Sequence, residues 1–247
     1  GFVFYLQNHD QIGNSLHGER LPKQTSPGRY RALLALLLLA PQTPMLFMGQ
    51  ESGAASPFLF FVDYAGNEIG SQVFQGRKTF LSQFPSYATQ EAQQAIADPN
   101  DSSTFKRSKL SVDEGYTETP FYRLHADLLR LRREDIVISS QDRDRVDGAV
   151  LGPHALAVRY LDAGGLDRLL ILNLGQDLHY VPAPEPLLAP RSDGYWQLVW
   201  SSDDPRYGGP GASNPLTEQG WHVPSESAWL FRTELSVPAG IHVGEHG

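Results

Sequence analysis

The sequence predicts an α/β region followed by a small antiparallel β-sandwich. In the first part of the chain, short apolar runs alternate with segments of helical character. Beyond about residue 135, only short β-type runs occur, separated by clusters of Gly, Pro and Asp. The 247 residues are 40% hydrophobic and 19% charged, which is typical of a globular protein that buries a core. We therefore expect domains over residues 1–135 and 136–234, and a loose tail over residues 235–247.

The first region should contain two buried strands joined by a helix. Residues 2–6 form a continuous apolar and aromatic run, which suits a strand covered on both faces, as in parallel sheets. A helix should begin at Ser26 and Pro27, since Ser favours the N-cap and Pro the first helical position, and should end before Pro41. A second buried strand is expected over residues 45–48. Two such strands cannot close a parallel barrel, so we expect this region to be part of a larger domain.

A long connection and a second helix follow. Residues 50–118 are rich in Gly, Pro, Ser and Asp, and connections of this length are functional or carry small elements of their own. A helix should begin at Thr119 and Pro120. Its buried face is formed by apolar residues at helical spacing: Phe121, Leu124, Leu128 and Leu131. Basic residues occupy its last turn, where the helix dipole favours cations: Arg130, Arg132 and Arg133.

The β region is predicted from four runs, over residues 155–161, 168–174, 196–200 and 228–232. Four aromatic residues of this region are more typical of a sandwich core than of a sugar-stacking surface: Trp196, Trp200, Trp221 and Trp229. Three histidines stand isolated, which favours surface positions over metal ligands: His179, His222 and His242. Three glycines predict a flexible loop without a phosphate-binding helix: Gly208, Gly209 and Gly211.

Composition excludes several classes of function. The net charge of −8 provides no basic stripe for nucleic acid. The absence of cysteine excludes disulfides and cysteine-bound metal, and agrees with a cytoplasmic location. The longest apolar run, residues 32–40, is far shorter than the roughly 20 residues needed to cross a bilayer. We expect neither nucleic acid nor membrane as a partner.

The motif NHDQIGN, residues 8–14, is the strongest chemical signal in the sequence. It follows the first predicted strand directly, and polar residues at the carboxyl ends of barrel strands are candidates for an active site. His9 and Asp10 could hydrogen-bond sugar hydroxyls, and an ionised Asp can stabilise an oxocarbenium ion. An alternative of about equal weight is that these residues only cap the strand and turn the chain. Glu51, just past the second strand, is either a second residue on the same rim or a solvated loop carboxylate.

Longer stretches of the sequence resemble the malto-oligosyltrehalose trehalohydrolase branch of the alpha-amylase superfamily. The strand ending NHD and the later strand ending FMGQE are similar to the last two strands of that superfamily's barrel. The family is indicated by the stretches PFLFFVDYAG, GRKTF and ADPNDSSTFKRSKL, and downstream by LHADLLRLRRED, VDGAVLG, RLLILNLG, PAPEPLLAP and WSSDDPRYGG. Gln50 and Ser52 depart from the family pattern, which has an acid and a bulky aromatic there. The resemblance implies the C-terminal part of a (β/α)8 barrel followed by a β-sandwich.

The resemblance also implies roles for the motif. Asp10 matches the third acidic residue of the superfamily site, which holds the sugar and stabilises the transition state. His9 matches the histidine that hydrogen-bonds the same sugar. Further candidates for substrate contacts are Asn8, Gln11, Asn14 and Glu51. The implied substrate is a malto-oligosaccharide or malto-oligosyltrehalose, without metal or cofactor.

The nucleophile and the general acid lie upstream of the NHD motif in the family's order, so we expect both to be absent from this chain. A retaining pair must flank one bond at about 5–5.5 Å, and nothing in the sequence arranges Glu19, Glu51 or Asp63 in that way. The implied partner is then the N-terminal portion of the barrel, and the chain alone should be inactive.

Two alternatives remain open. One is a fragment of a related α-glucan enzyme of the glycogen branching type, although the PFLFF stretch favours the trehalohydrolases. The other is a non-catalytic, carbohydrate-binding β-module.

Overall fold

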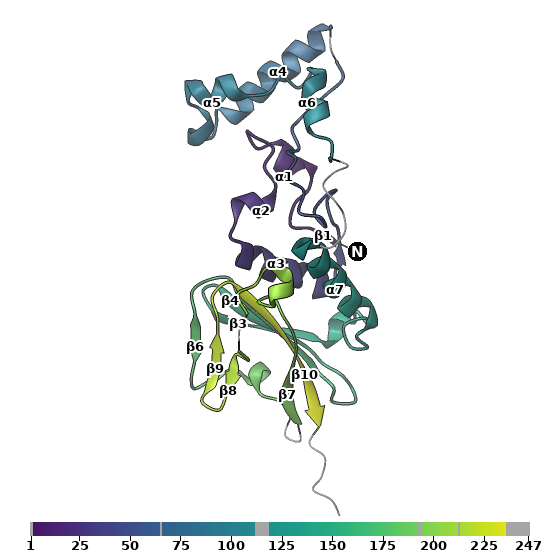
Figure 1. The fold of residues 1–247 in the computed structure, drawn as a ribbon, viewed down its shortest axis with the longest axis vertical. Coiled ribbons are helices and arrows are strands. Elements are labelled where there is room, and N and C mark those ends of the chain that lie inside the picture. Colours follow the sequence, from purple (N-terminus) through teal and green to yellow (C-terminus); the bar gives the residue numbers. More distant parts are fainter. Residues whose placement is uncertain (1, 65, 112–118, 192–193, 212, 236–247) are drawn as a thin grey trace, which may run out of the picture. The chain divides into compact units, whose positions relative to one another are not determined.

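The computed structural model describes residues 2–64, 66–111, 119–191, 194–211 and 213–235. The chain divides into two compact units, the first formed by Gly1–Tyr30 and Gln42–Ala126, the second by Arg31–Pro41 and Asp127–Gly247. The elements are labelled in Figure 1. Residues 236–247 of the predicted tail lie outside the described residues.

The first half of the chain is mainly helical. Its strands are β1 (Val3–Phe4) and β2 (Thr43–Pro44). Its helices are α1 (His9–Gly13), α2 (Leu21–Gln24), α3 (Pro27–Leu39), α4 (Glu68–Leu81), η1 (Pro85–Tyr87), α5 (Gln90–Ala95), α6 (Ser102–Arg107) and α7 (Pro120–Glu134). Four of these helices lie within the long predicted connection, which therefore carries small elements of its own. No helix in the described part of the chain is both long and apolar enough to cross a membrane.

Two short strands pair in parallel near the predicted positions, but they are not buried as expected. Val3 pairs with Thr43 and Phe4 with Pro44, and the Met45 amide donates to the Phe4 carbonyl at 2.7 Å. β2 ends at Pro44, so the run of residues 45–48, predicted as the second buried strand, follows β2 and is not itself a strand. Phe2 is 77% exposed and Phe4 47% exposed, so the prediction of a strand covered on both faces is wrong within the described residues. The reason is that β1 has one strand neighbour, and no described element covers its apolar side chains.

Both long predicted helices form, with the predicted caps. The Ser26 hydroxyl accepts from the Arg29 amide at 3.3 Å, and the Thr119 hydroxyl accepts from the Tyr122 amide at 3.1 Å. Leu124 and Leu128 are buried on the expected face of α7.

Arg132 lies in the last turn of α7, as predicted, and its side chain also contacts the end of another helix. It is buried, and its guanidinium donates to the carbonyls of Leu38 at 2.9 Å and Ala40 at 2.5 Å. These carbonyls lie at the C-terminus of α3. Arg132 therefore neutralises the C-terminal end of the α3 dipole.

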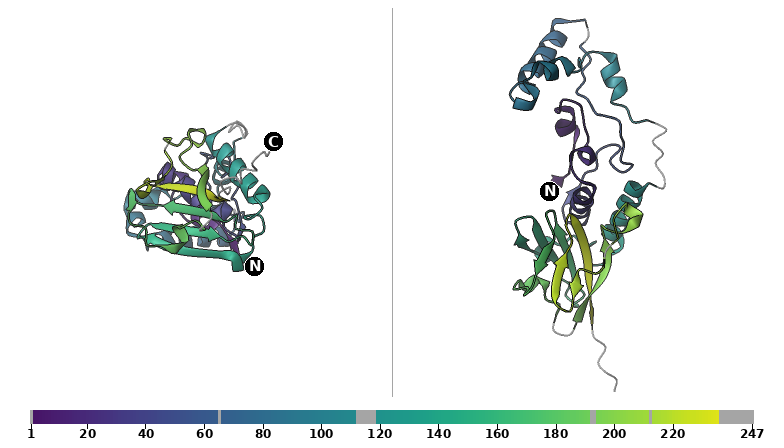
Figure 2. Two further views of the ribbon diagram at one scale, coloured as in Figure 1. Left: turned by 90° about the horizontal axis from the view of Figure 1, so that it is seen from below. Right: turned by 60° about the vertical axis from the view of Figure 1, so that its left-hand side comes forward.

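The second half of the chain is an antiparallel β structure of two sheets. Its strands are β3 (Val146–Gly152), β4 (Ala155–Tyr160), β5 (Arg168–Asn173), β6 (Leu178–Tyr180), β7 (Gly194–Ser201), β8 (Leu216–Thr217), β9 (Gly220–Val223) and β10 (Ser227–Leu235). The short helices η2 (Arg143–Arg145), η3 (Pro186–Leu188) and η4 (Pro205–Tyr207) connect them. The five-stranded sheet has the order β3-β4-β5-β10-β7, and the three-stranded sheet the order β6-β9-β8. In the right-hand view of Figure 2, β10 (yellow) runs beside the green strands with which it pairs.

The core of this region lies between the two sheets. Trp196 and Trp229 of the larger sheet pack in one cluster with Trp221 and Val223 of the smaller sheet. All four tryptophans are at most 6% exposed, so the prediction that they belong to the core is confirmed. The prediction of an antiparallel β region is confirmed with them.

His179 and His222 are not isolated, contrary to the prediction. They face each other across β6 and β9, and their rings stack with centroids 4.1 Å apart. The two residues are 43 positions apart in the sequence, and the register of the neighbouring strands brings them together. His242 lies outside the described residues.

The glycines after η4 form a packed turn rather than a flexible loop. The Gly211 amide donates to the Asp203 carbonyl at 2.7 Å, and Arg31 donates to the Gly208 carbonyl at 3.3 Å. A Cβ atom on Gly209 would overlap the backbone of Asp203. Close approach of two backbones therefore explains a glycine at position 209.

Candidate functional site

The NHDQIGN motif folds into the short helix α1, closed at its start by a capping box. The Asn8 side-chain oxygen accepts from the amides of Asp10 at 2.8 Å and Gln11 at 3.3 Å. In return, the Gln11 side-chain oxygen accepts from the Asn8 amide at 3.0 Å. Asn8 is only 8% exposed, so its side chain serves the helix. The motif thus has both a structural part and a part that remains free for chemistry.

His9 and Asp10 form the accessible part of the motif. Their side chains are 66% and 67% exposed, and the His9 Nε2 atom lies 3.3 Å from the Asp10 Oδ1 atom. The capping box fixes the backbone of this helical turn, while the polar ends of both side chains face solvent. An exposed carboxylate with a neighbouring imidazole can accept and donate hydrogen bonds to the same sugar.

Arg77 of α4 holds the C-terminal end of α1. Its guanidinium donates to the carbonyls of Gly13 at 2.6 Å and Ser15 at 3.2 Å, and to the Asn14 side chain at 3.4 Å. It also lies over the Phe60 ring, 4.8 Å from the centroid. Burial lowers the pKa of Arg77 from its very high ordinary value, and the charge still favours the helix C-terminus. Arg77 belongs to the GRKTF stretch, but no local signal in the sequence predicts this contact.

Gln11 and Asn14 line an open depression of about 320 Å³. Its other walls include three aromatic side chains from residues downstream of α1 in the chain, namely Phe80, Phe84 and Tyr87. The sequence prediction missed these aromatics, because an isolated Phe or Tyr in a long connection carries no functional pattern. The two predicted amides are thereby brought together at one surface, which we call the α1 depression.

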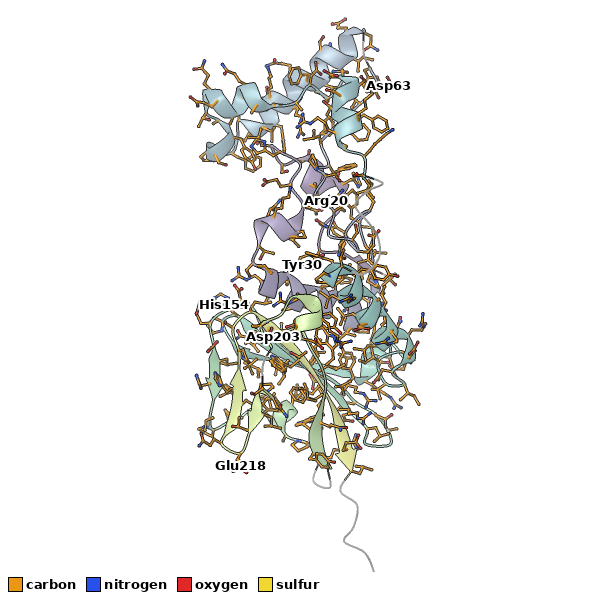
Figure 3. The ribbon with its side chains drawn as sticks, viewed as in Figure 1. Arg20, Tyr30, Asp63, His154, Asp203 and Glu218 are labelled. Atoms are coloured by element: carbon orange, nitrogen blue, oxygen red, sulfur yellow. The ribbon has the colours of Figure 1, made fainter. Side chains whose placement is uncertain are left out.

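Glu51 lies beside a group of buried polar side chains. Burial raises the pKa of the Tyr30 hydroxyl, labelled in Figure 3, and the Glu51 charge adds to this effect. Burial also lowers the pKa of His125, and the Glu51 charge partly offsets that effect. No hydrogen bond or ion pair joins Glu51 to the α1 motif among the described residues.

Gln50, at the position where an acid was expected, has a structural role. It is 1% exposed, and its side-chain oxygen accepts from the Phe47 amide at 3.3 Å and from the Gln7 side chain at 3.5 Å. Both contacts use the oxygen as acceptor, and a neutral amide avoids the cost of burying a charged carboxylate at this position.

Within the described ranges, no group of three or more His, Asp or Glu side chains is arranged to hold a metal ion.

Residues 143–223 match the family described as "Domain of unknown function (DUF3459)". Curated relatives named malto-oligosyltrehalose trehalohydrolase match larger parts of the chain. The relative from Deinococcus radiodurans is 42% identical over 199 residues, which is 77% of this chain and 31% of the relative. The relative from Saccharolobus solfataricus is 36% identical over 133 residues, which is 54% of this chain and 21% of the relative.

Solved structures of alpha-amylase-type enzymes have a similar fold. A structure assigned as an alpha amylase from Salmonella typhimurium has a TM-score of 0.69 and 28% identity, covering 94% of this chain and 35% of that one. A trehalose-6-phosphate hydrolase from Bacillus licheniformis has a TM-score of 0.56 and 15% identity, covering 94% of this chain and 43% of that one, a likeness of fold alone.

The chain spans about a third of the length of the D. radiodurans relative and about a fifth of the S. solfataricus relative. The stretches that suggested a family in the sequence thus agree with relatives found over most of the chain. By sequence, the chain is similar over most of its length to a malto-oligosyltrehalose trehalohydrolase, and its relatives are glycoside hydrolases of the alpha-amylase family.

Proposed function

We propose that this chain contributes the Asp10-bearing part of a glycoside hydrolase that acts on malto-oligosyltrehalose. The reaction would cleave the α-1,4-glucosidic bond next to the trehalose unit and release trehalose. The observation that carries the proposal is the exposed Asp10–His9 pair on a capped helix, in a chain 42% identical to a trehalohydrolase.

Asp10 would hold the sugar at the cleavage point and stabilise positive charge. Glycosidic cleavage passes through an oxocarbenium-like transition state, and a fixed carboxylate is worth most where such charge develops. The capping box supports this role, because α1 can hold Asp10 in place before substrate arrives. His9 would hydrogen-bond the same sugar, and Glu51 would belong to the rim of the site.

The region of residues 1–135 is proposed to supply the last two strands and helices of a (β/α)8 barrel. The parallel pairing of β1 with β2, connected through α3, supports this assignment. The exposed apolar side chains of β1 also support it, since a barrel strand has neighbours on both sides. Residues 136–234 would form the β-sandwich domain of the same protein.

The nucleophile and the general acid are proposed to come from the other parts of the relatives' length. The catalytic centre would then be completed only in the longer protein, and the 247-residue chain would not catalyse the reaction by itself. The first test is the release of trehalose from malto-oligosyltrehalose by the purified chain, with the D. radiodurans relative as positive control. We expect no release from the chain while the control is active. Release by the chain alone would place the nucleophile and the acid within it.

A second test concerns Asp10 directly. In a hybrid where this chain replaces the matching segment of the D. radiodurans relative, Asp10→Asn should lower kcat by roughly 10²–10³-fold, the usual effect of removing one transition-state stabiliser. Because Asp10 is exposed, the thermal midpoint should stay nearly unchanged. Asp63→Asn, another exposed carboxylate of the same unit, is the matched control and should leave kcat unaltered. Full activity of Asp10→Asn would rule out the assigned role.

A further inference from the structure

The aromatic wall of the α1 depression consists of rings that contact one another edge to face. The Phe80 and Phe84 centroids are 5.7 Å apart, and the Phe84 and Tyr87 centroids are 6.1 Å apart. The ring contacts hold the three side chains as a unit, yet Phe80 is 41% exposed and Phe84 46% exposed. Exposed aromatic faces gathered at one hollow are typical of a binding surface rather than of a core.

Two amide side chains also line the depression. Gln11 and Asn14 are three residues apart at α1, so their side chains emerge on the same side. The Asn14 side-chain oxygen is occupied by Arg77 at 3.4 Å, which leaves its amide N–H groups as donors toward a ligand. The Gln11 side chain is already engaged within the chain, because it accepts from the Asn8 amide at 3.0 Å and donates to the Tyr5 hydroxyl at 3.4 Å. The donors available to a sugar hydroxyl are therefore those of Asn14.

The chemistry of the described lining points to a neutral ligand. All the lining side chains are uncharged, and the nearest cation, Arg77, donates to the α1 carbonyls instead. A ligand with an ionic group would find no counter-charge here. A pyranose ring has an apolar face for the aromatic wall and hydroxyl groups for the amides.

We infer that the α1 depression is a glucosyl-binding subsite of an α-glucan, with Phe80, Phe84 and Tyr87 as its aromatic platform. The inference rests on the proposed function for its ligand class. Gln11 lies in the same short helix as Asp10, and Asn14 caps that helix, so the subsite would lie near the proposed point of cleavage. Phe80, Phe84 and Tyr87 then determine how well a long substrate binds, and take no part in bond cleavage.

The test is the calorimetric affinity of the 247-residue chain for maltohexaose. Phe84→Ala and Phe84→Leu should each weaken binding by roughly three- to tenfold, since either change removes the aromatic face. Phe84→Leu keeps the apolar bulk, so it separates ring stacking from packing. Phe105→Ala is the matched control, because Phe105 is also 46% exposed but lies outside the depression, and it should leave the affinity unchanged. The thermal midpoint of each variant verifies folding.

If both Phe84 variants bind maltohexaose with wild-type affinity, the subsite assignment is wrong. It is also wrong if the wild-type chain is folded but does not bind maltohexaose. Equal weakening by Phe105→Ala also overturns it, because the effect would then be unspecific. The hydrolysis assay with Asp10→Asn tests the proposed function separately from the subsite. If Asp10→Asn is fully active while Phe84→Leu still weakens binding, the reaction assignment fails and the subsite stands.

Discussion

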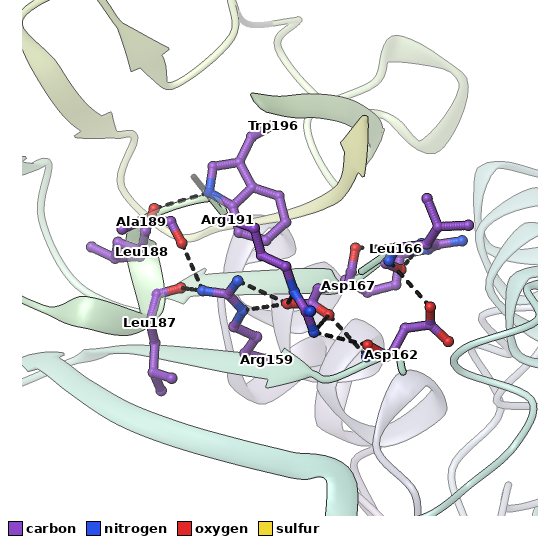
Figure 4. Close-up of polar contacts among 10 residues, drawn as sticks. Arg159, Asp162, Leu166, Asp167, Leu187, Leu188, Ala189, Arg191 and Trp196 are labelled. Carbon is purple, nitrogen blue, oxygen red and sulfur yellow. Dashed lines mark hydrogen bonds and ion pairs between the residues drawn. The ribbon is translucent and has the colours of Figure 1, made fainter. Parts of the chain in front are cut away.

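At the scale of single residues, buried charge is the most consequential feature of the β region. Asp167 is fully buried and accepts hydrogen bonds from Arg159 at 2.8 and 3.0 Å, from Arg191 at 3.1 and 3.3 Å, and from the Asp162 amide at 2.9 Å (Figure 4). Burial alone raises the pKa of Asp167, but these hydrogen bonds outweigh it and lower the pKa below its ordinary value. Arg159 also donates to the carbonyls of Leu187 and Ala189, so the group ties β4 to the segment around η3.

Asp167→Asn should destabilise the chain by about 3–5 kcal/mol at pH 7, because it leaves the buried Arg159 without a counter-charge. A carboxylate whose pKa is lower in the folded chain stabilises it above the unfolded pKa, and this contribution is lost as the pH falls below about 4. The difference in free energy of unfolding between wild type and variant should therefore be smaller at pH 3 than at pH 7. Urea denaturation at the two pH values measures this difference. Asp147→Asn, at an exposed position on β3, should show little change, and an equal loss there would refute the argument.

At the scale of elements, α1 is too short to be stable on its own, since isolated helices below about 12 residues are marginal in water. The capping box satisfies its first amides, and Arg77 satisfies carbonyls at its end. The candidate catalytic helix therefore depends on a side chain more than 60 residues away along the chain.

Arg77→Met should loosen α1 without unfolding the β region. Loss of donors to the Gly13 and Ser15 carbonyls should cost about 1–3 kcal/mol each where the acceptor stays buried. Hydrogen exchange of the Ile12 and Asn14 amides, which bond to the Asn8 and Asp10 carbonyls, should accelerate at least tenfold, about 1.4 kcal/mol in the opening equilibrium. Arg107→Met on α6, an exposed arginine, serves as the control. Unchanged α1 exchange in Arg77→Met would show that the capping box alone maintains the helix.

At the scale of the whole molecule, the exposed apolar side chains of β1 and of the residues that flank it can associate with other chains. Val3 is 55% exposed and Tyr5 40% exposed, in addition to Phe2 and Phe4. Exposed apolar strands with unpaired edges associate with other chains.

The 247-residue chain should therefore self-associate in a concentration-dependent way, and sedimentation velocity should detect species larger than the 27.4 kDa monomer. Phe2→Asp combined with Phe4→Asp should shift the distribution toward the monomer, since charge opposes strand pairing. Ile136→Asp, at a 75% exposed apolar residue of the second unit, should not. A wild-type chain that stays monomeric with one cooperative thermal transition would contradict this expectation.

Features that depend on neighbours a few positions apart were predictable from the sequence. The caps at Ser26 and Thr119 predicted where α3 and α7 begin, and four β-type runs predicted the strands β4, β5, β7 and β10. Within the candidate site, the motif made Asp10 and His9 candidates, and the structure leaves both accessible.

Tertiary structure alone decided which distant residues meet. Arg77 reaches Gly13 across 64 positions, His222 stacks on His179 across 43, and Phe84 joins Gln11 at one depression. The exposure of β1 was also misjudged, because an apolar run does not reveal which elements will cover it. The physical reason is common to these cases. Capping and strand patterns are satisfied within one turn or one strand, whereas contacts between segments depend on register and packing that no local pattern encodes.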